Sequence, residues 1–180
     1  MQILCFGDSN TYGYDPRGFI PGRYDAQNRW TDLIALKTGW DIINEGMNGR
    51  EIPCNINVTS FLEPYGSVDI FLIMLGTNEL LRGLSANTVA ERMSRFLQTV
   101  PCSGRLILIA PPPMKRGAWV NTDHLVLESY KLASEYKTIA EKLEITFINT
   151  HTWNIDLTFD GVHFSEAGNH SFANHIIEYL

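Results

Sequence analysis

The sequence predicts an α/β fold in three layers, in which helices cover both faces of a doubly wound parallel sheet of about five strands. The first observation is a set of short apolar runs without polar alternation, which is typical of parallel strands buried on both faces. The second is that helical patterns separate these runs, so that strand and helix alternate along the chain. The runs, of which the second is the weakest, are residues 3–6, 40–44, 68–75, 106–110 and 145–149.

Four segments between or after these runs have a helical pattern with recognisable ends. Gly39 closes the first segment and Pro101 stops the second, because neither residue readily continues a helix. Ser165 begins the last segment as an N-cap residue, followed by an acidic first turn. We therefore expect helices over residues 29–38, 85–100, 123–143 and 165–180.

Length and composition predict one domain over residues 1–180. A chain of 180 residues is long enough to bury a full core, and we find no internal repeat, low-complexity stretch or linker in it. The composition is ordinary for a globular protein, with 44% hydrophobic and 19% charged residues. The formal net charge of -6 repels phosphate backbones, so we expect no nucleic-acid partner.

The cysteines and the apolar pattern predict a cytoplasmic protein with no membrane partner. Cys5, Cys54 and Cys102 are odd in number and lack a Cys-x-x-Cys spacing, which disfavours a disulfide framework and fits a reducing compartment. No basic segment with a long apolar run opens the chain, and no run is long enough to span a bilayer. A secreted protein without its signal segment has the same pattern, so that alternative stays open.

Polar segments containing glycine follow the first three predicted strands, where parallel α/β folds carry their sites. Residues 7–11 read Gly-Asp-Ser-Asn-Thr, which places Ser9 at a strand-to-helix turn where negative charge is favoured. Residues 44–50 contain two glycines that permit close backbone approach to a ligand. Residues 76–79 read Gly-Thr-Asn-Glu, and the amide of Asn78 is a candidate hydrogen-bond donor. Each segment taken alone is better explained as a polar turn.

A fourth segment, Asp160-Gly161-Val162-His163, comes just before the last predicted helix. Three residues of separation in a tight turn let the carboxylate of Asp160 reach the imidazole of His163 and fix its tautomer. The remaining histidines have no comparable partner in the sequence, and we interpret them as core or surface residues. These are His124, His151, His170 and His175.

In their order and placement, the four segments resemble the SGNH (GDSL-like) hydrolase family, whose marker residues are Ser, Gly, Asn and His. Ser9 lies in the segment that is similar to the nucleophile block, and Gly49 falls where the family supplies a backbone N–H. Asn78 matches the side-chain donor, and Asp160 with His163 matches the acid and base of the last block. Residues 3–9 and the proline run at 111–113 resemble the arylesterase and acyltransferase branch.

This resemblance implies a serine esterase with a Ser9, His163 and Asp160 triad, an acyl-enzyme, and no metal or organic cofactor. The oxyanion hole would consist of the N–H groups of Ser9 and Gly49 and the amide of Asn78. Because few residues remain for a lid, we expect a small-molecule ester with a short acyl group, acetyl above all. The number of subunits stays open, a homo-oligomer included.

One residue departs from the family pattern, and six aromatic residues have two interpretations. The third block often ends in Asp, whereas this chain has Glu79, and the extra methylene alters how the Asn78 loop is braced. The aromatic residues are candidates either for the rim of the site or for the core. They are Tyr12, Tyr14, Trp30, Trp119, Trp153 and Phe159.

Two other functions fit the sequence less well. A metallophosphoesterase would carry Asp-x-His ahead of Gly7-Asp8 and a His beside Asn78, and this chain has neither. A flavodoxin-type module would bind a phosphate or nucleotide at residues 7–13, which leaves Asp160 and His163 without a role. Among esterase substrates, an aryl ester, an acetylated sugar, a lipid and a thioester all stay open.

Overall fold

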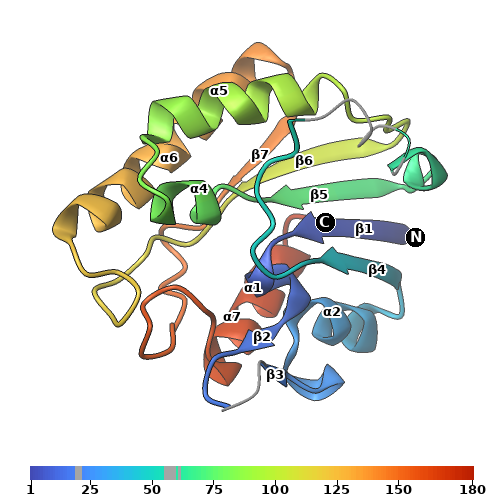
Figure 1. Ribbon diagram of the computed structural model, residues 1–180. Coiled ribbons are helices and arrows are strands. Elements are labelled where there is room, and N and C mark those ends of the chain that lie inside the picture. The colour runs from blue at the N-terminus through green and yellow to red at the C-terminus, as the bar shows by residue number, and fades with distance from the viewer. Residues whose placement is uncertain (19–21, 55–59, 61) are drawn as a thin grey trace.

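The computed structural model describes residues 1–18, 22–54, 60 and 62–180 of the chain (Figure 1). Within these residues, one parallel five-stranded sheet has the order β4-β1-β5-β6-β7, which confirms the predicted fold class. Each strand overlaps one of the predicted apolar runs. The strands are β1 (Gln2–Gly7), β4 (Asp41–Gly46), β5 (Ile70–Met74), β6 (Arg105–Ala110) and β7 (Thr146–Asn149).

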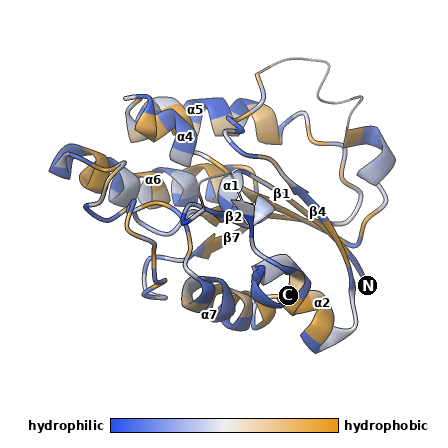
Figure 2. Ribbon diagram, turned by 60° about the horizontal axis from the view of Figure 1, so that its bottom comes forward, coloured by the Kyte–Doolittle hydropathy of each residue, from blue (hydrophilic) through white to orange (hydrophobic). Residues whose placement is uncertain are grey.

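One pair of long helices covers each face of the sheet (Figures 1 and 2). The pair on one face is α2 (Trp30–Thr38) and α7 (Glu166–Ile177), and the pair on the other is α5 (Ala86–Leu97) and α6 (Asp123–Lys142). All four lie within the segments that the sequence predicts. None of the helices in the described part of the chain is long and apolar enough to cross a membrane.

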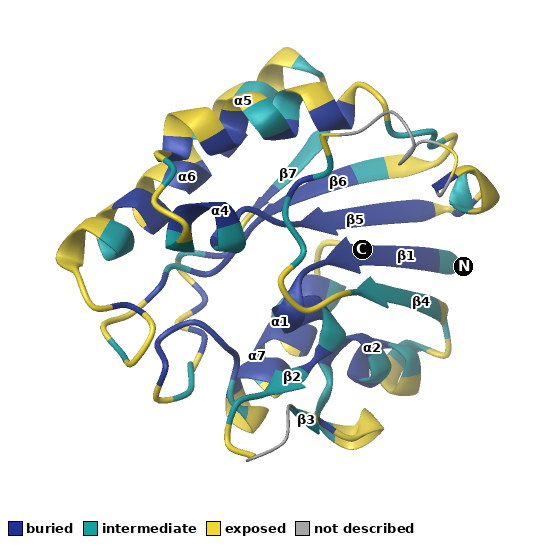
Figure 3. Ribbon diagram, in the orientation of Figure 1, coloured by how far each residue is buried: buried dark blue, intermediate teal, exposed yellow. Residues whose placement is uncertain are grey.

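The sheet is buried on both faces, which explains why its strands have continuous apolar runs. In β1, Ile3 and Cys5 pack into the apolar cluster beneath α2 and α7, whereas Leu4 and Phe6 pack into the cluster beneath α5 and α6. Figure 3 shows β5 buried throughout, β1 buried after its first residue, and β4 only partly buried. Because β4 is an edge strand, its apolar run is the weakest in the sequence.

Helix ends follow local chemistry that the sequence shows. The side-chain oxygens of Ser85, Thr122 and Ser165 accept hydrogen bonds from the first turns of α5, α6 and α7. Helix α2 ends where the N–H of Gly39 donates to the carbonyl of Ala35 at 2.8 Å. The ends of the long helices are therefore set by short side chains and one glycine.

Several short elements were not predicted, because they are too short to show a periodic pattern. Helices α1 (Ser9–Tyr12) and α4 (Thr77–Leu81) begin at the carboxyl ends of β1 and β5. In the sheet order, β1 lies between β4 and β5, so the chain winds away from β1 in both directions. In open α/β sheets, ligands generally bind beyond the carboxyl ends of the strands at such a point. Other short elements among the described residues include β2 (Tyr14–Asp15), β3 (Gly22–Arg23) and the 3₁₀ helices Ala26–Asn28 and Glu63–Tyr65.

Candidate active site

A continuous path of hydrogen bonds joins Ser9, His163 and Asp160. The Oγ of Ser9, the first residue of α1, lies 2.9 Å from Nε2 of His163. Nδ1 of the same ring lies 2.6 Å from Oδ2 of Asp160. The exposed fractions of the three residues are 7%, 2% and 0%, so water has little access to the path. The structure thus brings together three predicted residues, although Ser9 and His163 are 154 positions apart.

The carboxylate of Asp160 is held ionised by its neighbours. Its Oδ1 accepts hydrogen bonds from the backbone N–H groups of Val162 and His163 and from the hydroxyl of Thr158. Burial by itself would raise the pKa of Asp160, but the side-chain and backbone hydrogen bonds of His163 and the N–H of Val162 outweigh it and lower the pKa to about 2. An ionised Asp160 accepts the proton on Nδ1, so the neutral ring presents the lone pair of Nε2 to Ser9.

Asn10, the residue after Ser9, holds the backbone on both sides of His163. Its Nδ2 donates to the carbonyl of Val162 at 3.1 Å, and its Oδ1 accepts from the N–H of Phe164 at 2.9 Å. The side chain is buried, so both bonds are shielded from water. Sequence reasoning gave Asn10 no role, and its place beside Ser9 was the only available signal.

A loop after β6 packs backbone to backbone on the Asp160 segment. The N–H of Lys115 donates to the carbonyl of Gly161, and the N–H of Trp119 donates to the carbonyl of Asp160, both at 3.0 Å. Gly161 has φ 81°, and a Cβ there would lie 2.0 Å from the carbonyl oxygen of Lys115. Only glycine meets both conditions, so this contact fixes the position of the Asp160 segment.

Two backbone N–H groups that follow β1 and β4 have no acceptor among the described residues. Gly49 lies in a turn closed by a 3.1 Å hydrogen bond from Arg50 to Met47, and its φ of 71° is left-handed. Among the described residues, nothing accepts a hydrogen bond from the N–H of Gly49 or from that of Ser9. Both groups therefore remain able to donate to a ligand.

Helix α4 holds the Gly49 turn through two adjacent side chains. Nδ2 of Asn78 donates to the carbonyl of Arg50 at 2.9 Å, which leaves its second N–H for a ligand. Oε1 of Glu79 accepts from the N–H of Ile52. The longer side chain of Glu79 therefore braces the loop that carries Gly49. Its burial raises the pKa of Glu79, and within the described residues its second oxygen has no partner.

The helix that carries Ser9 begins at a buried carboxyl group. Asp8 is the N-cap of α1, and its Oδ1 accepts from the N–H of Asn10 at 3.0 Å. Burial raises the pKa of Asp8 to about 6. Arg50, close enough to act on this charge, lies with its guanidinium over the ring of Phe6 at 4.2 Å.

Four of the six aromatic candidates separate into site and core residues, whereas Phe159 is 64% exposed and Tyr12 lies beneath the guanidinium of Arg23. The ring centroids of Tyr14 and Trp119 lie 4.7 and 4.9 Å from that of His163. In contrast, Trp30 and Trp153 are buried and pack on Phe172 of α7. The sequence could not separate the two groups, because an aromatic residue suits both environments.

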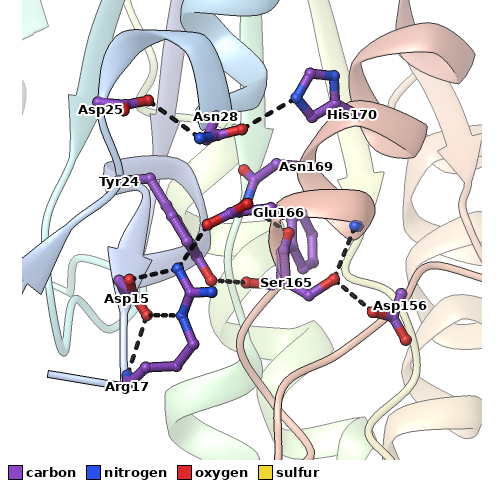
Figure 4. Close-up of polar contacts among 12 residues, drawn as sticks. Asp15, Arg17, Tyr24, Asp25, Asn28, Asp156, Ser165, Glu166, Asn169 and His170 are labelled. Atoms are coloured by element: carbon purple, nitrogen blue, oxygen red, sulfur yellow. Dashed lines mark hydrogen bonds and ion pairs between the residues drawn. The ribbon is translucent and has the colours of Figure 1, made fainter.

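Three of the other histidines contact residues outside the path from Ser9 to Asp160. His151 packs against Tyr130, and His175 stacks on Trp153 at 5.1 Å. His170 lies 3.2 Å from the side-chain oxygen of Asn28 (Figure 4). Over residues 1–18, 22–54, 60 and 62–180, no three His, Cys, Asp or Glu side chains gather as a metal site would require.

Solved structures of similar fold cover almost the whole chain. An aryl esterase from M. smegmatis has a TM-score of 0.83 at 23% identity, with 99% of each chain covered. A carbohydrate acetylesterase from Sinorhizobium meliloti has a TM-score of 0.81 at 23% identity, again with 99% of each chain covered. A member of the lipolytic protein G-D-S-L family from Veillonella parvula has a TM-score of 0.75 at 20% identity, with 99% of this chain and 97% of the other covered. At such identities the likeness shows the fold alone.

The family of the chain follows from its sequence as a whole. No curated protein matches it. The model of the GDSL-like lipase/acylhydrolase family, however, matches residues 5–170, which include every residue of the site described above. The chain therefore belongs to the GDSL-like lipase/acylhydrolase family and is an SGNH-type carboxylic ester hydrolase.

Proposed function

We propose that this hydrolase is a serine esterase that cleaves short-chain esters, acetates above all, through an acyl-enzyme on Ser9. The observation that carries the proposal is the buried path from Ser9 Oγ through His163 to Asp160, with contacts of 2.9 and 2.6 Å. A serine hydroxyl is a weak nucleophile by itself and needs an oriented base beside it. His163 supplies that base, and Asp160 orients it.

Acylation begins when the Oγ of Ser9 attacks the ester carbonyl carbon and its proton passes to Nε2 of His163. The carbonyl π electrons move to the oxygen and form a tetrahedral oxyanion. When this intermediate collapses, the bond to the alcohol oxygen breaks, and the alcohol leaves with the proton from Nε2. The negative charge of Asp160 stabilises the imidazolium between these steps.

We expect three donors to bind the oxyanion. They are the N–H groups of Ser9 and Gly49, which no described residue occupies, and the second N–H of Asn78. Removal of one such donor typically costs about 3 kcal/mol of transition-state stabilisation. Because Asn78 also holds the carbonyl of Arg50, its amide is oriented before the substrate arrives.

Deacylation repeats the same proton transfers with water in place of the alcohol. His163 takes a proton from water, the resulting hydroxide attacks the acyl carbon, and Ser9 leaves with the proton from Nε2. The products are a carboxylic acid and the free enzyme. The reaction balances with water alone, so we expect activity to survive prolonged chelation of divalent ions.

The proposed preference for short acyl groups rests on the burial of the reacting side chains. Ser9 and His163 are nearly buried, and few residues remain to form a groove or lid for an acyl tail. One of the similar structures is named as a carbohydrate acetylesterase, which favours the same interpretation.

Hydrolysis of p-nitrophenyl esters from acetate to decanoate tests the proposal. We expect kcat/KM to be greatest for acetate and to fall as the acyl chain lengthens. An apolar groove would instead add about 0.8 kcal/mol for each methylene that it buries. A maximum at eight carbons or more would overturn the short-acyl assignment, and no turnover of any ester would overturn the esterase itself.

A further inference from the structure

Two aromatic rings lie against His163 without taking part in the proton path. The ring of Tyr14 lies 4.7 Å from the imidazole at an interplanar angle of 59°, and the ring of Trp119 lies 4.9 Å away at 84°. His163 is only 2% exposed, whereas Trp119 remains 50% exposed. Trp119 therefore presents apolar ring surface to solvent directly beside the base of the reaction.

Backbone hydrogen bonds attach Trp119 to the segment that carries Asp160. Its own N–H donates to the carbonyl of Asp160 at 3.0 Å, and the N–H of Ala118 donates to the carbonyl of Phe159 at 3.1 Å. The next residue, Val120, is fully buried. A half-exposed indole gains little free energy from burial, so packing alone does not explain why Trp119 lies beside His163. Its position there favours contact with a ligand.

Tyr14 belongs to β2, which pairs with β3. Figure 4 shows this part of the chain beside the start of α7. Arg17 donates to Asp15 at 2.8 Å and to Glu166 at 2.7 Å. The hydroxyl of Tyr24 donates to the carbonyl of Phe164 at 3.1 Å, next to His163. Both aromatic rings are therefore attached to the segment that carries the base.

The chemistry of the reaction places the leaving alcohol next to these rings. His163 returns its proton from Nε2 to the alcohol oxygen, which must approach within hydrogen-bond distance of that nitrogen. The substituent on that oxygen then lies along the surfaces that border the imidazole. The carbonyl oxygen is held elsewhere, by groups that follow β1, β4 and β5. Tyr14 and Trp119 thus contact the alcohol rather than the acyl group.

We propose that Trp119 and Tyr14 form the subsite for the leaving alcohol and that it selects alcohols with a planar ring close to the ester oxygen. The inference rests on the proposed function, because it uses His163 as the group that protonates the alcohol. Aromatic rings prefer edge-to-face and offset contacts with another planar ring. The gain from one such contact corresponds to roughly a 2- to 10-fold change in kcat/KM.

Three acetate esters separate ring selection from apolar contact. Benzyl and cyclohexylmethyl acetate have the same carbon skeleton, but only the first has a planar ring, and propyl acetate has none. All three form the same acetyl-enzyme, so their kcat/KM values differ only through acylation. We expect benzyl acetate to exceed both others, and Trp119→Ala to lower the benzyl-to-propyl ratio by about tenfold. Trp119→Phe should retain most of that ratio.

Tyr130 supplies a matched control. It is also 50% exposed, and its ring lies 5.2 Å from that of His151 at 80°. Tyr130→Ala removes the same kind of contact from a histidine outside the proton path, and we expect the ratio to stay unchanged. Equal rates for benzyl and cyclohexylmethyl acetate, or a Trp119→Ala loss shared equally by all three esters, would overturn the proposal.

A binding measurement decides the subsite without any turnover. In an NMR titration with benzyl alcohol, the indole N–H signal of Trp119, assigned with Trp119→Phe, should shift, and cyclohexylmethanol should shift it less. Equal shifts, or none, would contradict the subsite. If no ester were hydrolysed while benzyl alcohol still moved the Trp119 signal, the esterase proposal would fail and the ring-binding site would stand.

Discussion

The two halves of the candidate site are built in different ways. The acid–base half, residues 158–164, places His163 and Asp160 in the interior, with exposed fractions of 2% and 0%. The oxyanion half, residues 46–52 with the start of α4, carries Gly49 on an exposed turn. The first half is held by elements far away in the sequence, whereas α4 holds the second through Asn78 and Glu79.

In the proposed mechanism the two halves have different tasks, and the difference in their construction matches these tasks. Proton transfer requires the 2.9 Å contact between Ser9 and His163 in every turnover, so the chain holds His163 from both sides. The N–H of Gly49 is needed only when negative charge develops, and it must stay open to the substrate. We therefore expect changes in the acid–base half to abolish catalysis and changes in the oxyanion half to weaken it.

The largest effects should come from the acid–base half. Asp160→Asn should lower kcat for p-nitrophenyl acetate by about 10⁴-fold, because the ring then loses its correct tautomer. The double variant Ser9→Ala with His163→Ala should be little worse than either single variant, since members of a triad act as a unit. Losses that multiply would mean that the two residues work independently.

The oxyanion half should show a smaller and different loss. Asn78→Ala should lower kcat by about 10²–10³-fold with little change in KM, because its donor acts mainly in the transition state. Steady-state kinetics with p-nitrophenyl acetate measure both constants. An increase confined to KM would instead make Asn78 a substrate-binding residue.

Asn10 tests whether the rigid backbone around His163 matters to the chemistry. Asn10→Ala frees the carbonyl of Val162 and the N–H of Phe164, and a shift of His163 by about 1 Å would cost on the order of 10²-fold in kcat. Asn169 is the matched control, because its buried amide also bonds backbone groups, those of Ser165 and Trp30.

Both variants should lose about 1–3 kcal/mol in the free energy of unfolding, because each strands buried polar groups. Only Asn10→Ala should lower the rate at which a fluorophosphonate labels the folded protein. Equal labelling rates in Asn10→Ala and Asn169→Ala at matched folded fractions would reduce Asn10 to a structural residue.

The smallest effect concerns Asp8, which lies between the two halves. Because burial raises its pKa from 3.8 to about 6, the folded chain binds this proton more tightly than the unfolded chain. The stability that Asp8 contributes is complete below its ordinary pKa and is lost as the pH rises through 6. Asp160 acts in the opposite direction, since its pKa is lowered to about 2 and its contribution is lost as the pH falls below about 4.

Asp8→Asn keeps the oxygen that accepts from Asn10 but removes the titration. Urea unfolding between pH 4 and pH 7 should therefore show a flatter stability profile for the variant than for the native chain. Parallel profiles would show that Asp8 titrates alike in the folded and unfolded chains.

The sequence predicted the long elements because their signals are local. Continuous apolar runs mark the buried strands, and Ser165 marks a helix start with its own hydroxyl. The short helices α1 and α4 were not predicted, because four or five residues show no periodicity. Their place was still indicated, since polar residues directly follow β1 and β5.

The site residues also divide into those with a local sequence signal and those without one. Ser9, Asn78 and His163 were predicted because each follows a strand or precedes a helix in a recognisable segment. The contacts of Asn10 were not, because its partners lie 152 and 154 positions away. Sequence reasoning likewise could not tell that Glu79 reaches Ile52, which depends on how the loop returns to α4.

Covalent labelling of Ser9 tests the central claim most directly. A fluorophosphonate should add one adduct per chain, which peptide mass spectrometry should locate on Ser9. Ser129→Ala, which alters a buried serine bonded to the carbonyl of Val126, should be labelled like the native chain. Ser9→Ala should take up no label, and a full-strength adduct on Ser9→Ala would contradict the role of Ser9 as the nucleophile.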